Sequence, residues 1–234
     1  MKIFKIIALY IFDLLDKFYH QKRINKFIKK NLNVETFLDV GAHLGSYTDL
    51  IYKNNPKSKI FMFEPQKKIF LKLKKKYLYR KNITAYNFAL SNKGGTTKLY
   101  INKHNVASTI SKINFDDDYL KHRAKLFGES SKSMIERIEK IKRMTLFDFI
   151  ENKRIKKIDL IKIDTEGHEL EVLKGLKNKL KIVNSILIEF QFNTVFLDYD
   201  ANKIHKYLKK NDLVLKKRFH FPFTSWEDRI YVRK

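Results

Sequence analysis

The chain has 234 residues, of which 44% are hydrophobic, so it can bury a full core and suits one α/β domain with an elaboration. It contains no cysteine, which excludes disulfides, thiolate metal sites and thiol nucleophiles. Its formal charge of +25 would attract phosphates, anionic lipids or acidic glycans, but the lysines are spread along the whole chain, so nucleic acid is not the favoured partner.

Residues 3–19 carry an apolar stripe at helical spacing. The longest uncharged run, 6–12, is shorter than the roughly 20 apolar residues that span a bilayer, and Asp13 and Asp16 interrupt any signal-peptide core. We therefore expect a cytoplasmic protein. Either this segment packs on the domain's own surface, or residues 1–30 make a peripheral contact with anionic lipid. We divide the chain into an N-terminal amphipathic helical extension, 1–35, and a main domain, 36–234.

The most informative stretch is an apolar run that contains Asp39 and passes into a turn with two glycines, Gly41 and Gly45. Glycine lets the backbone turn sharply and approach a ligand closely. A second apolar run, 59–63, ends at Glu64. The spacing from Gly45 to Glu64 is close to the value of about 20 at which doubly wound folds place an acid on ribose hydroxyls. The pair predicts a nucleoside pocket.

Strand-like and helix-like stretches then alternate, which predicts a doubly wound, mostly parallel sheet with helices on both faces. We expect helices at 45–54 and 66–79, the second with Phe70, Leu71, Leu73 and Leu78 facing inward, and a strand at 83–90. A turn at 92–95 and a strand at 96–101 predict a local hairpin. Residues 213–219 and 229–233 are typical of closing strands.

The polar stretch 102–142 breaks the alternation and predicts an inserted lid at about 103–140 that selects the substrate, or a merely decorative loop. We expect a helix around 134–141 within it. Three consecutive acids, 116–118, could chelate a cation or cap a helix, and capping is favoured because consecutive residues point in different directions.

The core pattern resumes at 157–164, a buried-type strand that ends at Asp164, and Thr165 is a plausible N-cap for the helix that follows. Ligands of parallel sheets bind beyond the carboxyl ends of the strands, so Asp39, Glu64 and Asp164 should converge at one rim. Glu189 lies within the apolar strand 185–192, where burying a carboxyl group is costly unless it has a polar partner or a functional role.

Six ordered blocks resemble the FkbM family of S-adenosylmethionine-dependent methyltransferases, from about residue 36 to 192. The most specific is Asp164–Glu169, which carries the pattern Asp-x-Glu-Gly-x-Glu; the blocks are 39–45, 63–65, 89–91, 144–148, 162–169 and 188–190. The resemblance implies a Rossmann-like, mostly parallel seven-stranded sheet of the class I methyltransferase type, with S-adenosyl-L-methionine as the cofactor.

The resemblance also implies which residues hold the cofactor. Glu64 would bind both ribose hydroxyls, and Tyr47 would close over the methionine end. His43 stands where the family commonly has asparagine; imidazole still donates one hydrogen bond, so binding could become pH-sensitive near neutrality. Two further groups of residues would complete the cofactor site. The turn after the first strand would surround the methionine and ribose with Asp39, Gly41, His43 and Gly45, and the end of the third strand would lie against the adenine with Ala89, Leu90 and Ser91.

Because a sulfonium methyl is already activated, the protein must mainly align an acceptor and take its proton. Asp164 is the first candidate for this role, followed by His168 and Glu189, while Glu166 could bind the acceptor hydroxyl. Alternatively, Glu166 and Glu169 merely stabilise the first turn of a helix. Asp164, Glu166 and His168 could also hold a divalent ion, but no further ligands lie at diagnostic spacing, so we expect no metal site.

Members of the family are generally O-methyltransferases of natural products, sugars or glycans, which implies a small-molecule or glycan acceptor. Two alternatives stay open: an RNA methyltransferase that uses the basic surface, and a cofactor-binding module without activity. The sequence does not indicate an oligomeric state.

Overall fold

The computed structural model describes residues 19–103, 108–222 and 224–234. Its centre is a seven-stranded sheet in the order β3-β2-β1-β7-β8-β10-β9. Neighbours from β3 to β8 are parallel, whereas β10 is antiparallel to both β8 and β9. This confirms the predicted mostly parallel sheet. The strands are β1 (Thr36–Val40), β2 (Lys59–Phe63), β3 (Ile83–Tyr86), β7 (Leu160–Ile163), β8 (Ser185–Gln191), β9 (Leu213–His220) and β10 (Trp226–Arg233).

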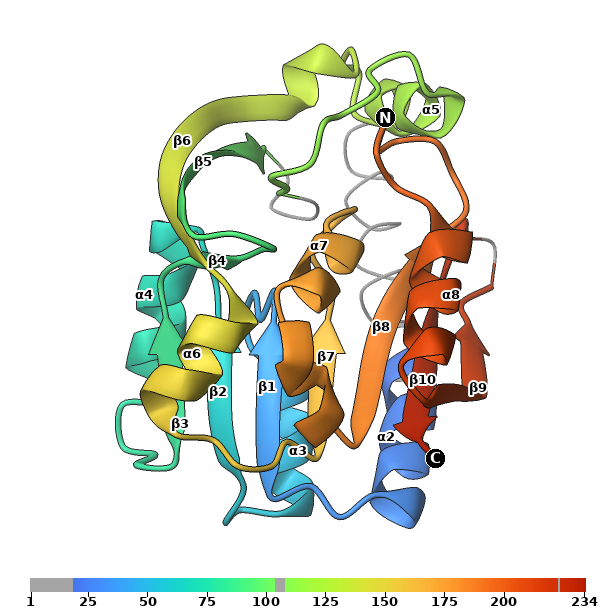
Figure 1. Cartoon of the computed structure of the whole chain (residues 1–234). Coiled ribbons are helices and arrows are strands. Elements are labelled where there is room, and N and C mark those ends of the chain that lie inside the picture. The colour runs from blue at the N-terminus through green and yellow to red at the C-terminus, as the bar shows by residue number, and fades with distance from the viewer. Residues whose placement is uncertain (1–18, 104–107, 223) are drawn as a thin grey trace.

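Helices cover both faces of the sheet (Figure 1). One face packs against α2 (Gln21–Asn31), α3 (Ser46–Asn54) and α4 (Lys67–Lys76), and the other against α6 (Leu146–Lys153), α7 (Glu169–Lys174) and α8 (Ala201–Lys210). Side chains of a strand alternate between the two faces, so Phe37 enters the first core and Leu38 the second.

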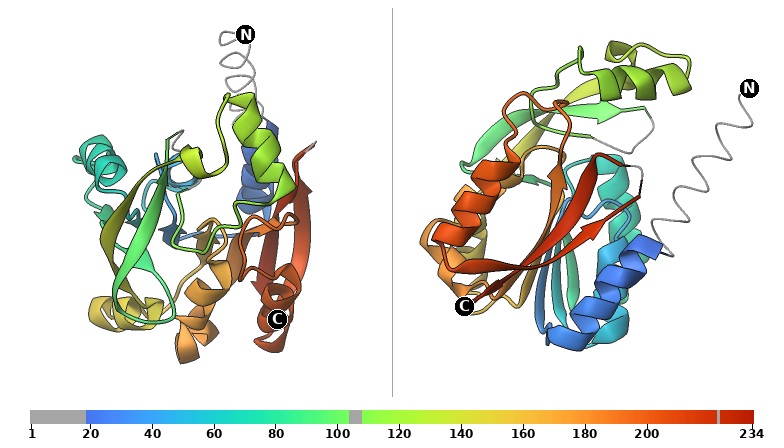
Figure 2. Two further views of the ribbon diagram at one scale, coloured as in Figure 1. Left: turned by 90° about the horizontal axis from the view of Figure 1, so that it is seen from above. Right: turned by 90° about the vertical axis from the view of Figure 1, so that its right-hand side faces the viewer.

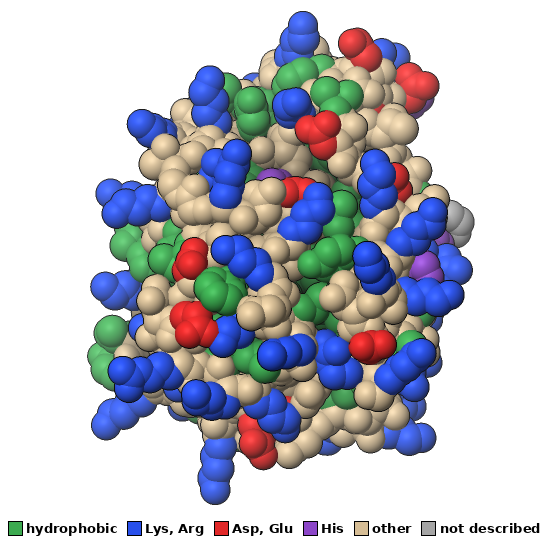
Figure 3. Space-filling model, viewed as in Figure 1, with side chains coloured by type: hydrophobic (Ala, Val, Ile, Leu, Met, Phe, Trp, Pro, Cys, Tyr) green, Lys and Arg blue, Asp and Glu red, His purple; other side chains and the backbone are tan. Residues whose placement is uncertain are grey.

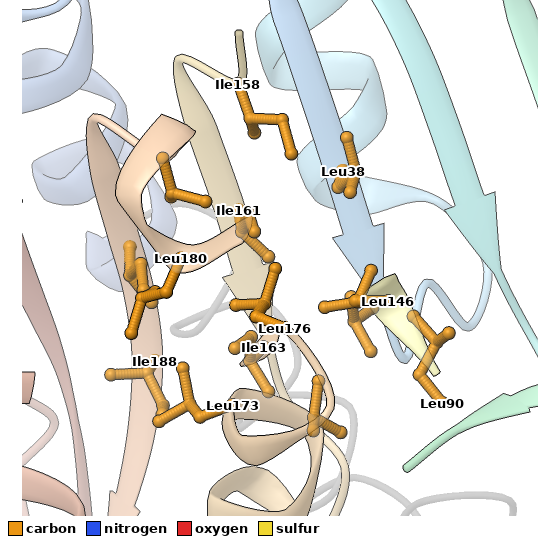
Figure 4. Close-up of a cluster of buried hydrophobic side chains, with 14 of the residues drawn as sticks. Leu38, Leu90, Leu146, Ile158, Ile161, Ile163, Leu173, Leu176, Leu180 and Ile188 are labelled. Carbon is orange, nitrogen blue, oxygen red and sulfur yellow. The ribbon is translucent and has the colours of Figure 1, made fainter. Parts of the chain in front are cut away.

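The second core, which lies between the sheet and helices α6, α7 and α8, shows how α7 is positioned (Figure 4). Leu173 and Leu176 meet Ile161 and Ile163 of β7, and all four side chains are fully buried. Burying one such side chain contributes about 1.5–3 kcal/mol, so the leucine spacing after Gly167 fixes the position of α7 against the sheet.

Helix α2 belongs to the first core although it precedes the first strand. Ile24 and Ile28 are buried there, while Lys22, Lys26 and Lys29 are exposed. The apolar face of this helix is therefore used by the fold itself. The stripe that precedes it lies in residues 1–18, outside the described residues.

A smaller sheet lies beyond the carboxyl ends of the central strands (Figure 2). Its order is β4-β6-β5, with β4 (Ala89–Leu90) parallel and β5 (Gly95–Asn102) antiparallel to β6 (Ile135–Met144). Between β5 and β6 lie α5 (Asp118–Leu126) and the short 3-10 helix η2 (Lys132–Met134). The side chain of Asp117 accepts a 2.9 Å hydrogen bond from the Leu120 amide, which confirms capping as the role of the acidic run.

Several predictions about this region were wrong. Residues 83–90 form two strands of different sheets, β3 and β4, because the chain turns at 87–88. The predicted local hairpin is absent, because β6 lies between β4 and β5 and pairs with β5 in antiparallel fashion. The strand β6 also replaces the helix expected around 134–141. Apolar residues recur in that segment at every third position, 135, 138, 141 and 144, with pairs of charged residues between them. This spacing is closer to the helical period than to the strict alternation of a strand.

Two predictions about helices were also wrong. Leu71 and Leu78 are exposed, because α4 turns Ile69 and Leu73 to the sheet instead. Thr165 is not an N-cap: α7 begins at Glu169, and Glu166 precedes it with a φ of 54°. A stabilising role of Glu166 in the first helical turn is therefore excluded.

Lys and Arg side chains cover the visible face without gathering into one patch (Figure 3). Within the described ranges, no helix has the length and apolar character needed to cross a membrane.

Candidate active site

The carboxyl ends of β1, β2, β7 and β8 meet at a cavity of about 1370 Å³. All four predicted catalytic residues line it, as do most predicted cofactor residues: Asp164, Glu166, His168 and Glu189, with Gly41, His43, Tyr47, Glu64, Ala89 and Leu90. Asp39, Gly45 and Ser91 do not line the cavity but support residues that do. Glu64 and Asp164 thus converge at one rim as predicted, whereas Asp39 is buried and does not reach it.

The turn after β1 passes through three left-handed residues, Gly41, His43 and Gly45, at φ values of 76°, 45° and 77°. A Cβ on Gly41 would lie 1.8 Å from the Asp164 backbone oxygen, and one on Gly45 would lie 2.6 Å from the Tyr77 hydroxyl oxygen. Both positions therefore require glycine. Histidine is among the residues enriched at positive φ, which accounts for its tolerance at position 43.

Glu64 is buried beneath this turn. Its Oε2 accepts a hydrogen bond from the His43 amide at 3.0 Å, and its Oε1 accepts one from the Gln66 amide at 2.8 Å. Burial raises the pKa of Glu64 to about 7, although both amide bonds act to lower it. An ionised carboxylate offers about four lone-pair sites, so one on each oxygen remains for a vicinal diol. The residue therefore fits the ribose of S-adenosylmethionine.

Asp39 lies in the wall behind Glu64. Its Oδ2 accepts a 2.7 Å hydrogen bond from the Thr48 hydroxyl, while its buried Oδ1 has no partner among the described residues. Burial raises its pKa, against the effect of Lys162.

Lys162 is a functional candidate that sequence reasoning missed. It stands opposite Asp39 in the β1–β7 register, and its Nζ lies 2.7 Å from Asp164 Oδ2 and 4.8 Å from the centre of the Tyr47 ring. Burial alone would lower the pKa of Lys162, but Asp164 and Asp39 hold it above its ordinary value. A lysine between isoleucines in a buried strand was the available signal.

Three carboxyl groups gather next to Lys162. Each of Asp164, Glu166 and Glu189 has one oxygen within 4.8 Å of the other two. The Gln191 amide donates 3.1 Å hydrogen bonds to both Glu166 Oε2 and Glu189 Oε1. Burial, and then the charge of Asp164, raise the pKa of both glutamates. The cluster can therefore retain protons near neutral pH and exchange them with a ligand.

His168 faces away from this cluster. Its Nε2 lies 2.9 Å from Ser91 Oγ, and burial lowers its pKa to about 4. The imidazole is therefore neutral above that pH and links α7 to the end of β4. The alternative of a cation site formed by Asp164, Glu166 and His168 is not assembled, because Glu189 and not His168 lies beside the other two carboxyl groups. Three carboxylates are ligands that a hard cation accepts, but the Lys162 ammonium already holds one of them.

A second network reaches the cavity from α2. His20 Nε2 lies 2.8 Å from Asp228 Oδ2, and the Tyr47 hydroxyl donates to the same oxygen at 3.3 Å. Asp228 stands opposite Glu189 in the β8–β10 register and lines the cavity together with Trp226. Apart from Tyr47, these side chains carry no local sequence signal, because their contacts to Asp228 join residues about 200 positions apart.

Comparison with known proteins agrees with this geometry. The model of the methyltransferase FkbM domain matches residues 39–215. The hexuronic acid methyltransferase AglP of Haloferax volcanii is 26% identical over 151 residues, 64% of this chain and 54% of that protein. The methyltransferase sdnD of Sordaria araneosa is 28% identical over 175 residues, 68% of each chain. The match thus spans about half the length of the Haloferax relative.

Solved structures share the fold at low identity. Aeropyrum pernix fibrillarin with bound S-adenosyl-L-methionine has a TM-score of 0.52 at 10% identity, over 90% of this chain and 74% of that chain. A SAM-dependent methyltransferase from Aquifex aeolicus has a TM-score of 0.50 at 15% identity, over 94% and 93%. Because the family model covers well over half of the chain, we conclude that the chain belongs to the FkbM family of S-adenosylmethionine-dependent methyltransferases.

Proposed function

We propose that the protein is an O-methyltransferase that acts on a hydroxyl of a sugar, a glycan or a hydroxylated natural product. The observation that carries the proposal is that Glu64 and the carboxyl cluster line the same cavity. The relative named as a hexuronic acid methyltransferase supports a sugar acceptor.

S-adenosylmethionine, when bound, supplies an activated methyl group. In this proposal Glu64 holds the ribose hydroxyls, and the turn 41–45 surrounds the donor. Tyr47 lies beside its methionine end, and Ala89 and Leu90 form the adenine side, with Ser91 supporting that side through His168.

On the acceptor side, Asp164 takes the proton of the attacking hydroxyl, since Lys162 fixes one of its oxygens at 2.7 Å and the other can face the ligand. Glu166 and Glu189 orient the acceptor through hydrogen bonds, and the Gln191 amide holds them in place. His168 acts as a neutral contact of the donor wall through Ser91.

Two variants test the division of roles. Glu64→Ala should abolish S-adenosylhomocysteine binding in calorimetry, whereas Asp164→Asn should keep that binding and lose methyl transfer from labelled donor to a saccharide panel. Loss of donor binding in Asp164→Asn would reassign this residue to the donor site, and unchanged binding in Glu64→Ala would refute the ribose contact.

The same labelled donor tests the alternatives. The carboxyl cluster of Asp164, Glu166 and Glu189 in the cavity disfavours a negatively charged phosphodiester chain. We therefore expect label to enter saccharide and not RNA. Donor binding without transfer to either class would favour a binding module.

We also propose that the protein acts in the cytoplasm. Peripheral membrane contact through residues 1–30 stays a prediction. Flotation with anionic liposomes would test it on the whole chain and on a chain that lacks only residues 1–18, because α2 packs in the core.

A further inference from the structure

The cavity is larger than one small-molecule site requires. Its volume of about 1370 Å³ exceeds the range of roughly 300–1,000 Å³ that is typical of such pockets. The donor site described above uses the side formed by the turn 41–45, Tyr47, Glu64 and the end of β4 at 89–90. The remaining space extends under the segment between β5 and β6, so a second, sizeable ligand has room beside the donor.

The two sides of this remaining space differ in chemistry. The floor comes from the ends of β7 and β8 and is polar, with the carboxyl cluster and the Gln191 amide. The roof comes from the segment 108–135 and is largely apolar; the side chains that matter here are Ile113, Phe115, Tyr119, Leu120 and Leu126. A ligand that satisfies both sides must carry hydroxyl groups at one end and apolar surface at the other.

Some apolar side chains of the roof are exposed and do not pack against the rest of the protein. Leu126 is 63% exposed and Tyr119 is 38% exposed, yet both line the cavity. Large apolar side chains exposed at a concave surface indicate an apolar partner.

Polar anchors hold the roof in position above the floor. Asp117 Oδ2 accepts hydrogen bonds from the Thr194 amide at 3.1 Å and from its hydroxyl at 2.6 Å. The Asn114 amide donates to the Val195 carbonyl at 2.8 Å. The Thr109 hydroxyl donates to the Glu166 carbonyl at 2.6 Å, so the roof begins directly beside the carboxyl cluster. A single ligand can therefore contact both.

We infer that the acceptor is an amphiphile: a hydroxylated ring that lies on the carboxyl cluster, joined to an apolar chain that lies under α5. This inference rests on the proposed function and narrows it, because a free sugar or a polar glycan would leave the roof uncovered. The ring supplies the hydroxyl that is methylated, and the chain supplies much of the affinity.

A homologous series of probes tests the inference on the whole chain saturated with S-adenosylhomocysteine. Methyl, hexyl and octyl β-D-glucopyranosides are titrated calorimetrically below the concentrations at which they form micelles. A buried methylene is worth up to about fourfold in affinity, and a half-open site about twofold. The affinity should therefore rise about 4- to 16-fold from hexyl to octyl.

Two matched variants locate the effect. Leu126→Lys should flatten the dependence on chain length while S-adenosylhomocysteine affinity stays unchanged. Leu71→Lys on α4 is the control, since Leu71 is 53% exposed but does not line the cavity. Equal affinity for all three glycosides in the unaltered protein, no binding of any of them, or an equal loss in Leu71→Lys would overturn the inference. Failure of S-adenosylhomocysteine to bind at all would instead refute the proposed function.

Discussion

The proposed donor side and the proposed acceptor side of the cavity are built in different ways. The donor side uses one continuous turn and the acid after the next strand, linked by the hydrogen bond from the His43 amide to Glu64. The acceptor side joins segments that are far apart in the chain, such as Asp117 and Thr194. The donor side is thus specified by local sequence and the acceptor side by tertiary contacts. Each prediction below challenges one side of this comparison.

The largest effect is expected from Gly41→Ala. The added Cβ would lie 1.8 Å from the Asp164 backbone oxygen at a φ of 76°, and a backbone atom cannot move aside as a flexible side chain can. We expect a loss of more than about 4 kcal/mol in the free energy of unfolding, measured by urea denaturation.

Gly128→Ala is the matched control, because Gly128 has a φ of 71° and nothing within 4 Å of the added Cβ. Only the backbone penalty of about 1–2 kcal/mol should appear. Similar losses of stability in the two variants would mean that the positive φ of Gly41, and not its contact with the Asp164 backbone oxygen, explains the glycine at this position.

Lys162→Met should cost about 3–5 kcal/mol, because it leaves buried Asp39 and its neighbour Asp164 without their compensating cation. The deficit should shrink at low pH, where the carboxylates become protonated. Lys157→Met is the control: Lys157 lies 2.7 Å from buried Asp159, but its own side chain is 60% exposed, so its removal should cost far less. A deficit that is independent of pH would contradict the electrostatic explanation.

The donor side could be predicted from sequence because its signals are local. The glycine turn, Glu64 and the order of strands and helices all follow from short patterns. Lys162 was missed because an isolated charge in a strand does not reveal its partner, which only the β1–β7 register identifies.

The acceptor side could be predicted only in part. Asp164, Glu166 and Glu189 line the cavity as expected, and the roof lies within the predicted insert 103–140, but Asp228 was not assigned. The strand β6 was mistaken for a helix because its apolar residues recur every three positions, whereas its strand conformation depends on pairing with β5, a contact that the sequence does not display.

Donor affinity should depend on pH through Glu64. Its pKa of about 7 in the empty protein means that below pH 7 the carboxyl must lose a proton before it can accept both ribose hydroxyls. The affinity for S-adenosylhomocysteine should therefore rise up to about tenfold per pH unit between pH 5 and 7 and level off above. Calorimetry at several pH values measures it, and Glu64→Gln should remove the dependence.

The raised pKa of Glu64 also predicts how the stability of the protein without donor depends on pH. The folded-state pKa of Glu64 lies above the ordinary value of 4.5, so its contribution is fully present below pH 4.5 and is lost as pH rises through about 7. Relative to Glu64→Gln, the unaltered protein should lose up to roughly 3 kcal/mol over this window. A relative gain with rising pH would show that Glu64 is ionised in the empty site.

The smallest effect tests the acceptor side alone. Asp117→Ala removes the cap of α5 and the anchor to Thr194, which together should cost about 1–2 kcal/mol of local stability. Amide hydrogen exchange in 112–127 should become about 5- to 30-fold faster, while S-adenosylhomocysteine affinity stays constant. Asp116→Ala is the control, because the side chain of Asp116 is 95% exposed. Faster exchange in β1 and β2 as well would mean that the roof and the donor side unfold together, and the two sides would then be one cooperative unit.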